Sequence, residues 1–152
     1  MSDMKNNYNE GDLFGVPIST SEFIIGLIVK VNNNKMLCYF FSRKVSSLTD
    51  SKIEIERDEV LLVIMCSALG LDKKHWKLIG RYNNWDAKDW KVPNFKRIDI
   101  ITNKCYEIIY NDSLEEIDSK EVADCASLDD FPEDGLAGYG YVEKRLSRLL
   151  TF

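Results

Sequence analysis

The sequence predicts a mainly β domain of the α+β class, built around an antiparallel sheet and ending in a helix. Short apolar runs separated by polar turns fill the first half, a second hairpin pattern follows, and the last residues have helical spacing. A length of 152 residues suits one ordinary domain, and 45% apolar with 30% charged residues is close to the globular average. We therefore expect a single domain over residues 1–152, with a flexible stretch at residues 1–10.

The first three strands are expected at Asp12–Ile18, Glu22–Val31 and Lys35–Val45, because each stretch is rich in large apolar residues. Ser19–Ser21 and Asn32–Asn34 supply the turns between them. Sequential short strands joined by tight turns are typical of an antiparallel meander. The expected outline is an SH3-like barrel that is partly open.

Two further segments before Gly70 are expected to be strands. Lys52–Glu56 alternates Lys-Ile-Glu-Ile-Glu, which is the period-two pattern of a half-buried strand. Val60–Leu69 is a continuous apolar run that suits either a buried helix or a buried strand. Its β-branched beginning and the strands expected on both sides favour a central strand.

Beyond Gly70, Trp76–Ile79 is expected to form a strand that ends at Gly80, followed by a polar loop at Arg81–Asp89. Trp90–Phe95 is expected to be extended, because the proline at position 93 disfavours a helical conformation of the residue before it. This region therefore adds one strand and two irregular connections.

A second hairpin is predicted from Arg97–Ile101 and Cys105–Tyr110, joined by a Thr-Asn-Lys turn. After it, Gly140–Leu150 is expected to be a terminal amphipathic helix, with basic residues between the apolar ones. The apolar residues at helical spacing are Val142, Leu146, Leu149 and Leu150.

The stretch from His75 to Phe95 contains all three tryptophans and the only histidine. We assign Trp76, Leu78, Ile79 and Phe95 to the core, because they lie in strand-like or extended segments. Trp85 lies among Asn and Asp residues in the polar loop, where burial is hard to arrange, so we expect it to contact a partner. Trp90 is compatible with either location.

The segment 111–134 carries ten acidic residues against one basic residue, Lys120, which gives a net charge of −9. The rest of the chain carries +4, since the whole chain carries −5. One interpretation is a solvated loop or a weak helix around Leu114–Ser127. The other is a surface that attracts an electropositive protein and speeds its association. Nucleic acid would be repelled by this segment, so we do not expect it as a partner.

No motif in the sequence supports catalysis, a cofactor or a metal site. There is neither a Gly-x-Ser-x-Gly elbow nor a phosphate-binding Gly-rich loop, and the four cysteines include no Cys-x-x-Cys pair. Cys38, Cys66 and Cys105 lie in apolar runs typical of buried free thiols, which suits a reducing cytoplasm. We also expect no signal peptide and no membrane span, because no apolar run approaches the roughly 20 residues that a bilayer requires.

Five short motifs follow one another in a defined order. They are EGDLFGVPI (residues 10–18), FIIGLIV (23–29), WKLIG (76–80), WKVPNF (90–95) and GLAGYGYVEKRL (135–146). In this order they resemble the immunity protein 26 family of bacterial polymorphic-toxin systems, and the resemblance covers nearly the whole chain. It implies a cytoplasmic protein, encoded beside a toxin gene, that binds the toxin and covers its active or substrate-binding surface without chemistry of its own.

Two other functions stay open. An SH3-like module would bind a peptide or a small ligand in an aromatic groove lined by Tyr82, Trp85 and Trp90. A hydrolase would require Cys66 and His75 to be adjacent and accessible to solvent.

Under the immunity interpretation, the expected toxin-binding residues are acidic side chains of the segment 111–134 and two tryptophans. They are Asp118, Glu121, Asp124, Asp129, Asp130, Glu133, Trp85 and Trp90. If the toxin is a nuclease, its basic substrate-binding face would be matched by these carboxylates. The oligomeric state stays open.

Overall fold

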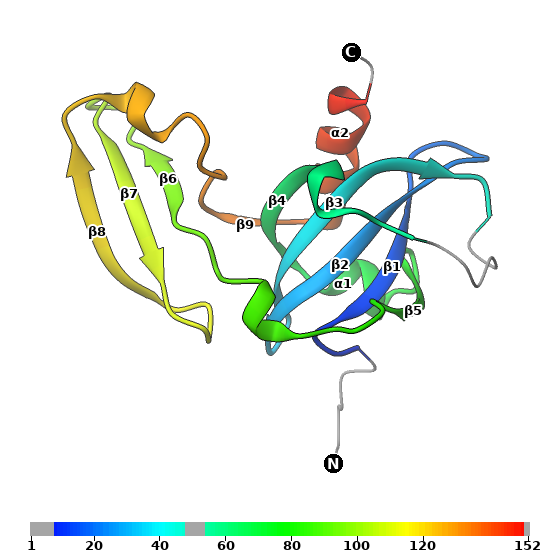
Figure 1. Ribbon diagram of the computed structural model, residues 1–152. Helices are drawn as coiled ribbons and strands as arrows, with labels where there is room; N and C mark the ends of the chain where they lie inside the picture. The colour runs from blue at the N-terminus through cyan, green and yellow to red at the C-terminus, as the bar shows by residue number, and fades with distance from the viewer. Residues whose placement is uncertain (1–7, 48–53, 151–152) are drawn as a thin grey trace.

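Six strands form the main sheet in the computed structural model, which describes residues 8–47 and 54–150 (Figure 1). They are β1 (Asp12–Pro17), β2 (Phe23–Asn32), β3 (Lys35–Val45), β4 (Val60–Ser67), β5 (Lys77–Arg81) and β9 (Leu136–Ala137). The order across the sheet is β5-β1-β2-β3-β4-β9, and all neighbours are antiparallel except β4 and β9. Among the described strands, β5 and β9 do not pair with each other, so the sheet does not close into a barrel. The predicted mainly β, α+β fold with a partly open sheet is confirmed.

The predicted meander is present, because β1 to β4 are consecutive neighbours. The bounds of β3 agree with the predicted strand, and the segment from Val60 forms a strand as far as Ser67 rather than a helix. This strand is not central, however. It is second from the edge of the sheet, and its outer neighbour β9 pairs only with Met65 and Cys66.

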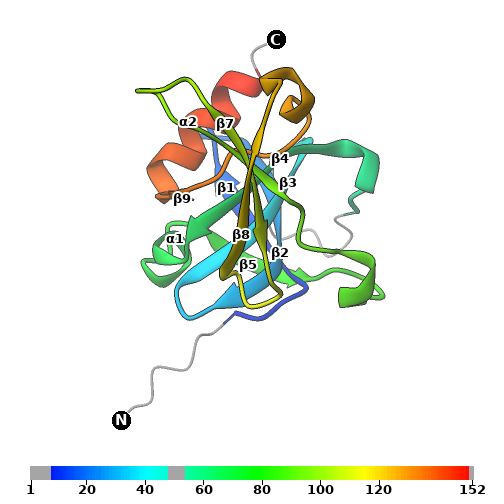
Figure 2. The ribbon, with the colours of Figure 1, turned by 90° about the vertical axis from the view of Figure 1, so that its left-hand side faces the viewer.

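A second, antiparallel sheet of three strands stands beside the first (Figure 1). It contains β6 (Phe95–Ile98), β7 (Cys105–Tyr110) and β8 (Glu116–Val122), in that order. Seen from the side of this sheet, β7 and β8 cross in front of the main sheet (Figure 2). The predicted hairpin is confirmed, but its first strand ends at Ile98 because Asp99 begins the turn.

The helical elements are short apart from the last one. They are η1 (Arg57–Glu59), α1 (Leu69–Asp72), η2 (Ala87–Asp89), η3 (Cys125–Leu128) and α2 (Tyr139–Leu149). The predicted terminal helix is α2, and its Val142 and Leu146 are fully buried against the main sheet. Within the described ranges, no helix is both long enough and apolar enough to cross a membrane.

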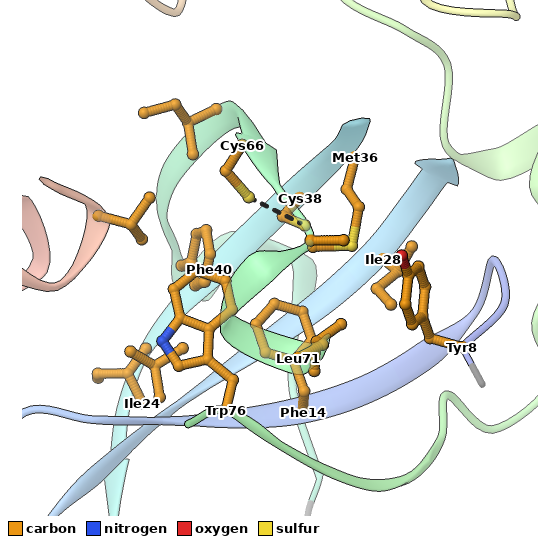
Figure 3. Close-up of a cluster of buried hydrophobic side chains, with 14 of the residues drawn as sticks. Tyr8, Phe14, Ile24, Ile28, Met36, Cys38, Phe40, Cys66, Leu71 and Trp76 are labelled. Atoms are coloured by element: carbon orange, nitrogen blue, oxygen red, sulfur yellow. Dashed lines mark hydrogen bonds between the residues drawn. The ribbon is translucent and has the colours of Figure 1, made fainter. Parts of the chain in front are cut away.

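One face of the main sheet is filled by packed aromatic rings (Figure 3). Phe14 stacks on Trp76 with ring centroids 5.3 Å apart, and Phe40 meets Phe14 edge to face at 5.7 Å. The free thiols of Cys38 and Cys66 lie in the same cluster, with their sulfur atoms 3.7 Å apart. Burial, together with the contact to Cys66, raises the pKa of the Cys38 thiol. Both cysteines therefore act as small apolar side chains, as predicted.

The opposite face of the main sheet packs against the second sheet and the segment that leads into it. On β2, Ile24 and Ile28 belong to the aromatic cluster, whereas Leu27 and Val29 belong to the cluster on the other face. That second cluster also contains Trp90, Phe95, Ile108 and Leu114. Because both faces of β2 are covered, the strand is a continuous apolar run rather than an alternating one.

The strand expected at Trp76–Ile79 differs from the structure at its end. Instead of stopping at Gly80, β5 continues to Arg81, and Gly80 adopts a φ of +151° where the register between β5 and β1 shifts. Trp76 is buried as predicted, as is Phe95. The assignment of Leu78 to the core is wrong: it is 40% exposed, because β5 is an edge strand of the sheet.

The prediction of a strand at Lys52–Glu56 is wrong for the residues that the structure describes. Lys52 and Ile53 lie outside the described residues, and Glu54–Glu56 form no strand. The chain turns here because the Glu59 carboxylate accepts a hydrogen bond from the Glu56 N–H at 3.1 Å, which begins η1. At the N-terminus, residues 1–7 also lie outside the described residues, and Tyr8 is buried in the core.

Cys105 is not the free thiol that the sequence predicted. It forms a disulfide with Cys125, which links β7 to η3 across 20 residues of sequence. The apolar surroundings of Cys105 were recognised correctly, but its bonding partner lies in an acidic segment with no apolar pattern. This disulfide fixes one end of the second sheet.

Candidate partner-binding surface

The acidic segment 111–134 is not the continuous loop or weak helix that was expected around Leu114–Ser127. Its first part forms β8, which pairs with β7 from Cys105 to Tyr110, and its second part forms η3. All residues of β8 are exposed except Val122, which is half-buried. The pairing with β7 and the disulfide explain why so charged a sequence becomes a strand, since neither depends on local propensity.

Three of the predicted carboxylates on and after β8 point in different directions. Asp118 is opposite Ile109 and Glu121 is opposite Tyr106, and an odd separation along a strand places side chains on opposite faces. Glu121 lies 4.0 Å from the Lys104 ammonium. Asp124 caps η3, where its carboxylate accepts a hydrogen bond from a backbone N–H at 3.0 Å. These three residues therefore form no common patch.

The other three predicted carboxylates meet at a groove between the two sheets. The groove has a volume of about 300 Å³ and is lined on one side by Val60–Ile64 of β4. Asp129, Asp130 and Glu133 lie on its other side, with Lys96 of β6 among them. We call this site the β4 groove. Three of the eight predicted toxin-binding residues meet here.

Negative charge predominates in the β4 groove. Arg145 of α2 lies 4.0 Å from the Glu133 carboxylate, and Lys96 donates its hydrogen bond to the backbone carbonyl of Asp129 at 3.4 Å rather than to a carboxylate. Within residues 8–47 and 54–150, no Lys, Arg or His side chain forms an ion pair with Asp129 or Asp130. These two carboxylates are exposed and remain available to an external cation.

The chain before α2 creates this groove by joining both sheets in succession. The Lys96 N–H donates to the carbonyl of Pro132 at 2.9 Å, and the Asp134 N–H donates to the Lys96 carbonyl at 2.8 Å. Three residues later the same chain pairs with β4, in parallel, at Cys66 and Ala137. Because this segment meets β4 only near the strand's end, a gap remains along the first half of β4.

Asp134 belongs to the interior rather than to the acidic surface. Its side chain is only 6% exposed, and it accepts hydrogen bonds from Arg97 Nε at 2.8 Å and from the Tyr110 hydroxyl. Arg97 also pairs with Glu116 at 2.7 Å. Burial and the hydrogen bond to Asp134 raise the pKa of the Tyr110 phenol. Two of the ten acidic residues in the segment therefore hold the second sheet together.

The predicted tryptophans form a packed cluster. Trp90 is 2% exposed, stacks on Trp85 with ring centroids 6.1 Å apart, and lies under the Arg57 guanidinium at 4.1 Å. Trp85 is half-buried and covers Gly11, where an added Cβ would come within 2.6 Å of its ring. Tyr82 meets Trp90 edge to face at 5.5 Å. These rings pack on one another, and Trp90 belongs to the core.

The tip of the β6–β7 hairpin exposes apolar side chains that were expected to lie in a strand. Ile100 is 86% and Ile101 is 89% exposed. The loop that carries them is held by Asp99, whose carboxylate accepts hydrogen bonds from the N–H groups of Ile101 at 2.9 Å and Thr102 at 3.4 Å. These bonds lower the pKa of the Asp99 carboxyl. An Asp four residues before an Asn-Lys pair was the signal that could have located this loop.

The residues proposed for a hydrolase do not meet the conditions set for them. Cys66 is completely buried, so no substrate could reach its sulfur. His75 is exposed and contacts α2 instead, with its Nε2 3.0 Å from Glu143. The same carboxylate accepts a hydrogen bond from the Trp76 indole N–H at 3.0 Å. His75 and Trp76 therefore attach α2 to the main sheet.

Comparison with protein families identifies a matching family. The model for immunity protein 26 matches residues 9–107, which is well over half of the chain. The chain belongs to the immunity protein 26 family. Neither the curated proteins nor the solved structures contain a match.

The immunity protein 26 match covers the main meander and β6, and it ends at Glu107, within β7. It includes the motifs of β1, β2 and β5 and the extended segment Trp90–Phe95, but it ends before the motif Gly135–Leu146. The match is thus shorter than the resemblance expected from the sequence. The acidic segment 111–134 also lies beyond it, so the groove carboxylates lie outside the part that defines the family here.

Proposed function

We propose that this immunity protein 26 family member binds and neutralises a cognate bacterial toxin encoded by a neighbouring gene. It would act without chemistry of its own, by covering the toxin's active or substrate-binding surface. The observation that carries this proposal is the family match over residues 9–107. The cytoplasm is the proposed place of action, because the toxin would threaten the cell there.

The acidic surface supports a toxin with a basic face. Asp129 and Asp130 present carboxylates at the β4 groove that no cationic side chain in the described ranges pairs with, and Asp118 adds an exposed carboxylate on β8. Charges arranged in this way attract a basic protein surface over a distance and raise its rate of association. A nuclease toxin would offer such a surface, since it must hold a phosphate backbone.

The hairpin tip supports a contact of a different kind. Ile100 and Ile101 extend into solvent from a loop in which the Asp99 carboxylate accepts hydrogen bonds from two backbone N–H groups. A rigid apolar projection binds with a smaller loss of conformational entropy than a flexible one. We include these isoleucines in the proposed toxin-binding surface together with the groove carboxylates.

Co-expression tests the proposed function directly. The toxin domain encoded by the adjacent upstream gene is induced with and without this protein, and growth and co-purification are scored. We expect restored growth and a stable complex, whereas a toxin from an unrelated system should still kill. Absence of both rescue and co-purification, with a demonstrably active toxin, would refute the proposal.

A variant with neutral side chains tests whether the carboxylates attract the toxin electrostatically. It replaces six carboxylates by their amides, at Asp118, Glu121, Asp124, Asp129, Asp130 and Glu133. The change at position 124 keeps a side chain that can cap η3. We expect slower association with the toxin and a weaker dependence of the association rate on salt. Unchanged kinetics would remove these carboxylates from the interface.

A further inference from the structure

The first half of β4 is an open strand edge. On its outer side, β9 pairs only with Met65 and Cys66, and no described strand pairs with that side of Val60–Val63. On an edge strand, every second residue directs its backbone N–H and C=O groups away from the sheet. These groups face the β4 groove, whose lining includes all four residues.

This edge lacks most of the features that usually prevent strand pairing. Natural edge strands are commonly blunted by charged side chains or proline. The edge strand β8 follows that rule, since Glu116, Asp118, Lys120 and Glu121 are all charged. By contrast, Val60–Val63 has the sequence VLLV, with no charge and no proline. A bulge at Leu61, where Phe40 pairs with Leu62 and Phe41 with Val60, bends the strand without covering it.

The side of the groove opposite β4 favours a bound segment that carries positive charge. The carboxylates of Asp129 and Asp130 have no cationic partner among the described residues, as shown above. A segment lying along β4 would place its side chains beside these carboxylates. Lys or Arg side chains would complement them, and acidic side chains would be repelled.

We infer that the β4 groove receives an extended, basic segment of the toxin, which adds to the main sheet as a strand along Val60–Val63. This inference rests on the proposed function and deepens it by assigning the class of binding element. Backbone hydrogen bonds to the open edge would supply affinity, and Asp129 with Asp130 would select Lys or Arg side chains. Four residues of strand span about 13 Å, so the added segment is short.

Amide hydrogen exchange detects strand addition directly. The exchange rates of the backbone amides of β4, including those of Leu62 and Val63, are measured by NMR. The measurement is made with and without a catalytically inactive variant of the upstream-encoded toxin domain. We expect the outward-facing amides of Val60–Val63 to exchange at least about tenfold more slowly in the complex. A complex in which these amides exchange at their free rate would overturn the inference while leaving the proposed function intact.

Charge reversal tests the second wall of the groove. The variant Asp129→Lys/Asp130→Lys should weaken toxin binding by at least about tenfold, because it places two ammonium groups beside a basic segment. The matched control is Asp72→Lys/Asp112→Lys, which makes the same change in net charge at exposed positions outside the groove and outside the proposed toxin-binding residues. Equal losses in the two variants would show a general charge effect and would overturn the assignment to the groove.

Two further outcomes separate this inference from the proposed function. If the toxin domain does not bind at all, the proposed function fails and the inference fails with it. If the free protein dimerises in sedimentation experiments and the Val60–Val63 amides are protected in that dimer, the edge is occupied by a second copy of the chain. That result would overturn the inference even if the toxin binds elsewhere.

Discussion

Phe14 lies directly over Gly26, its partner across the β1–β2 pair. A Cβ atom added to Gly26 would lie 2.4 Å from Cζ of Phe14. The ring cannot retreat, because it is fully buried between Trp76 and Phe40. The glycine in the FIIGLIV motif is therefore required by the packing of one aromatic ring, and an aromatic side chain over a glycine on the next strand is a recognised stabilising arrangement.

Gly26→Ala should therefore destabilise the fold. Overpacking of a close-packed core costs about 1–3 kcal/mol, and we expect a loss in that range from urea denaturation. The matched control is Gly140→Ala in α2, where an added Cβ meets no atom within 4 Å. The control should be neutral or slightly stabilising, because alanine favours a helix more than glycine does. A variant Gly26→Ala as stable as the control would contradict this account of the core.

The disulfide between Cys105 and Cys125 should stabilise the oxidised protein. Closing a loop of 20 residues removes conformational entropy from the unfolded chain worth about 3 kcal/mol. We expect a reducing agent to lower the Tm of the wild type and to leave Cys105→Ala/Cys125→Ala unaffected. Alkylation of the unfolded protein should detect two free thiols, those of Cys38 and Cys66, before reduction. Four free thiols in the purified protein, or a Tm independent of reductant, would show that the bond does not form.

The redox state of this pair inside the cell also bears on the proposed location. Disulfides are rare in a reducing cytoplasm. Trapping thiols at the moment of cell lysis and comparing the result with the purified protein measures this state. Reduced Cys105 and Cys125 at lysis would fit the cytoplasm, and a disulfide already present at lysis would contradict that placement.

Stability should decrease at alkaline pH because of Tyr110. Burial and the hydrogen bond to Asp134 raise the pKa of its phenol in the folded state, whereas the unfolded phenol ionises with a pKa of about 10. A raised pKa in the folded state means that the stabilisation is complete below pH 10 and is lost as pH rises above it. Tyr110→Phe should reduce this loss, measured as the change in urea midpoint between pH 8 and pH 11. A residual decrease is expected from Tyr39, whose pKa is also raised by burial. The same pH dependence in both proteins would contradict the assigned contact.

The isoleucines at the hairpin tip should matter for binding and not for folding. Ile100→Ser/Ile101→Ser should leave the free energy of unfolding unchanged within about 0.5 kcal/mol, because both side chains are almost fully exposed. If the tip enters the toxin interface, affinity should fall about tenfold or more. Ile117→Ser is the control, since Ile117 is 61% exposed on β8 but lies outside the tip. Equal affinities of the tip variant and the control would remove the tip from the interface.

The strands that could be predicted from sequence are those that local patterns define. β1, β2 and β3 are apolar runs ended by polar turns, and the structure places them within about two residues of the expected positions. β8 could not be predicted, because Glu-Ile-Asp-Ser-Lys-Glu-Val is a poor strand sequence and depends on pairing with β7. β9 is only two residues long, and its parallel pairing with β4 joins positions 71 residues apart, such as Met65 and Leu136. Such long-range pairings leave no periodic signal in the local sequence.

The candidate site was predicted in the same uneven way. The charge density of 111–134 did not distinguish the exposed Asp129 and Asp130 from Asp134, which Arg97 and Tyr110 hold in the interior. That distinction depends on contacts between segments distant in the sequence. The β4 groove was likewise invisible, since its walls come from β4 and from residues about 70 positions later. Trp85 was expected in an exposed loop and is half-buried, because Trp90 and Gly11 provide it with a packing surface.

The most direct test of the central claim is a titration of the purified toxin domain with this protein. The toxin is the product of the adjacent upstream gene, and its activity on its own substrate is measured as the protein is added. A non-catalytic inhibitor that covers the active surface should abolish activity at one molar equivalent, with no loss of intact toxin and with recovery of activity when the complex is dissociated. Full toxin activity in the presence of a large excess of the protein would contradict the account.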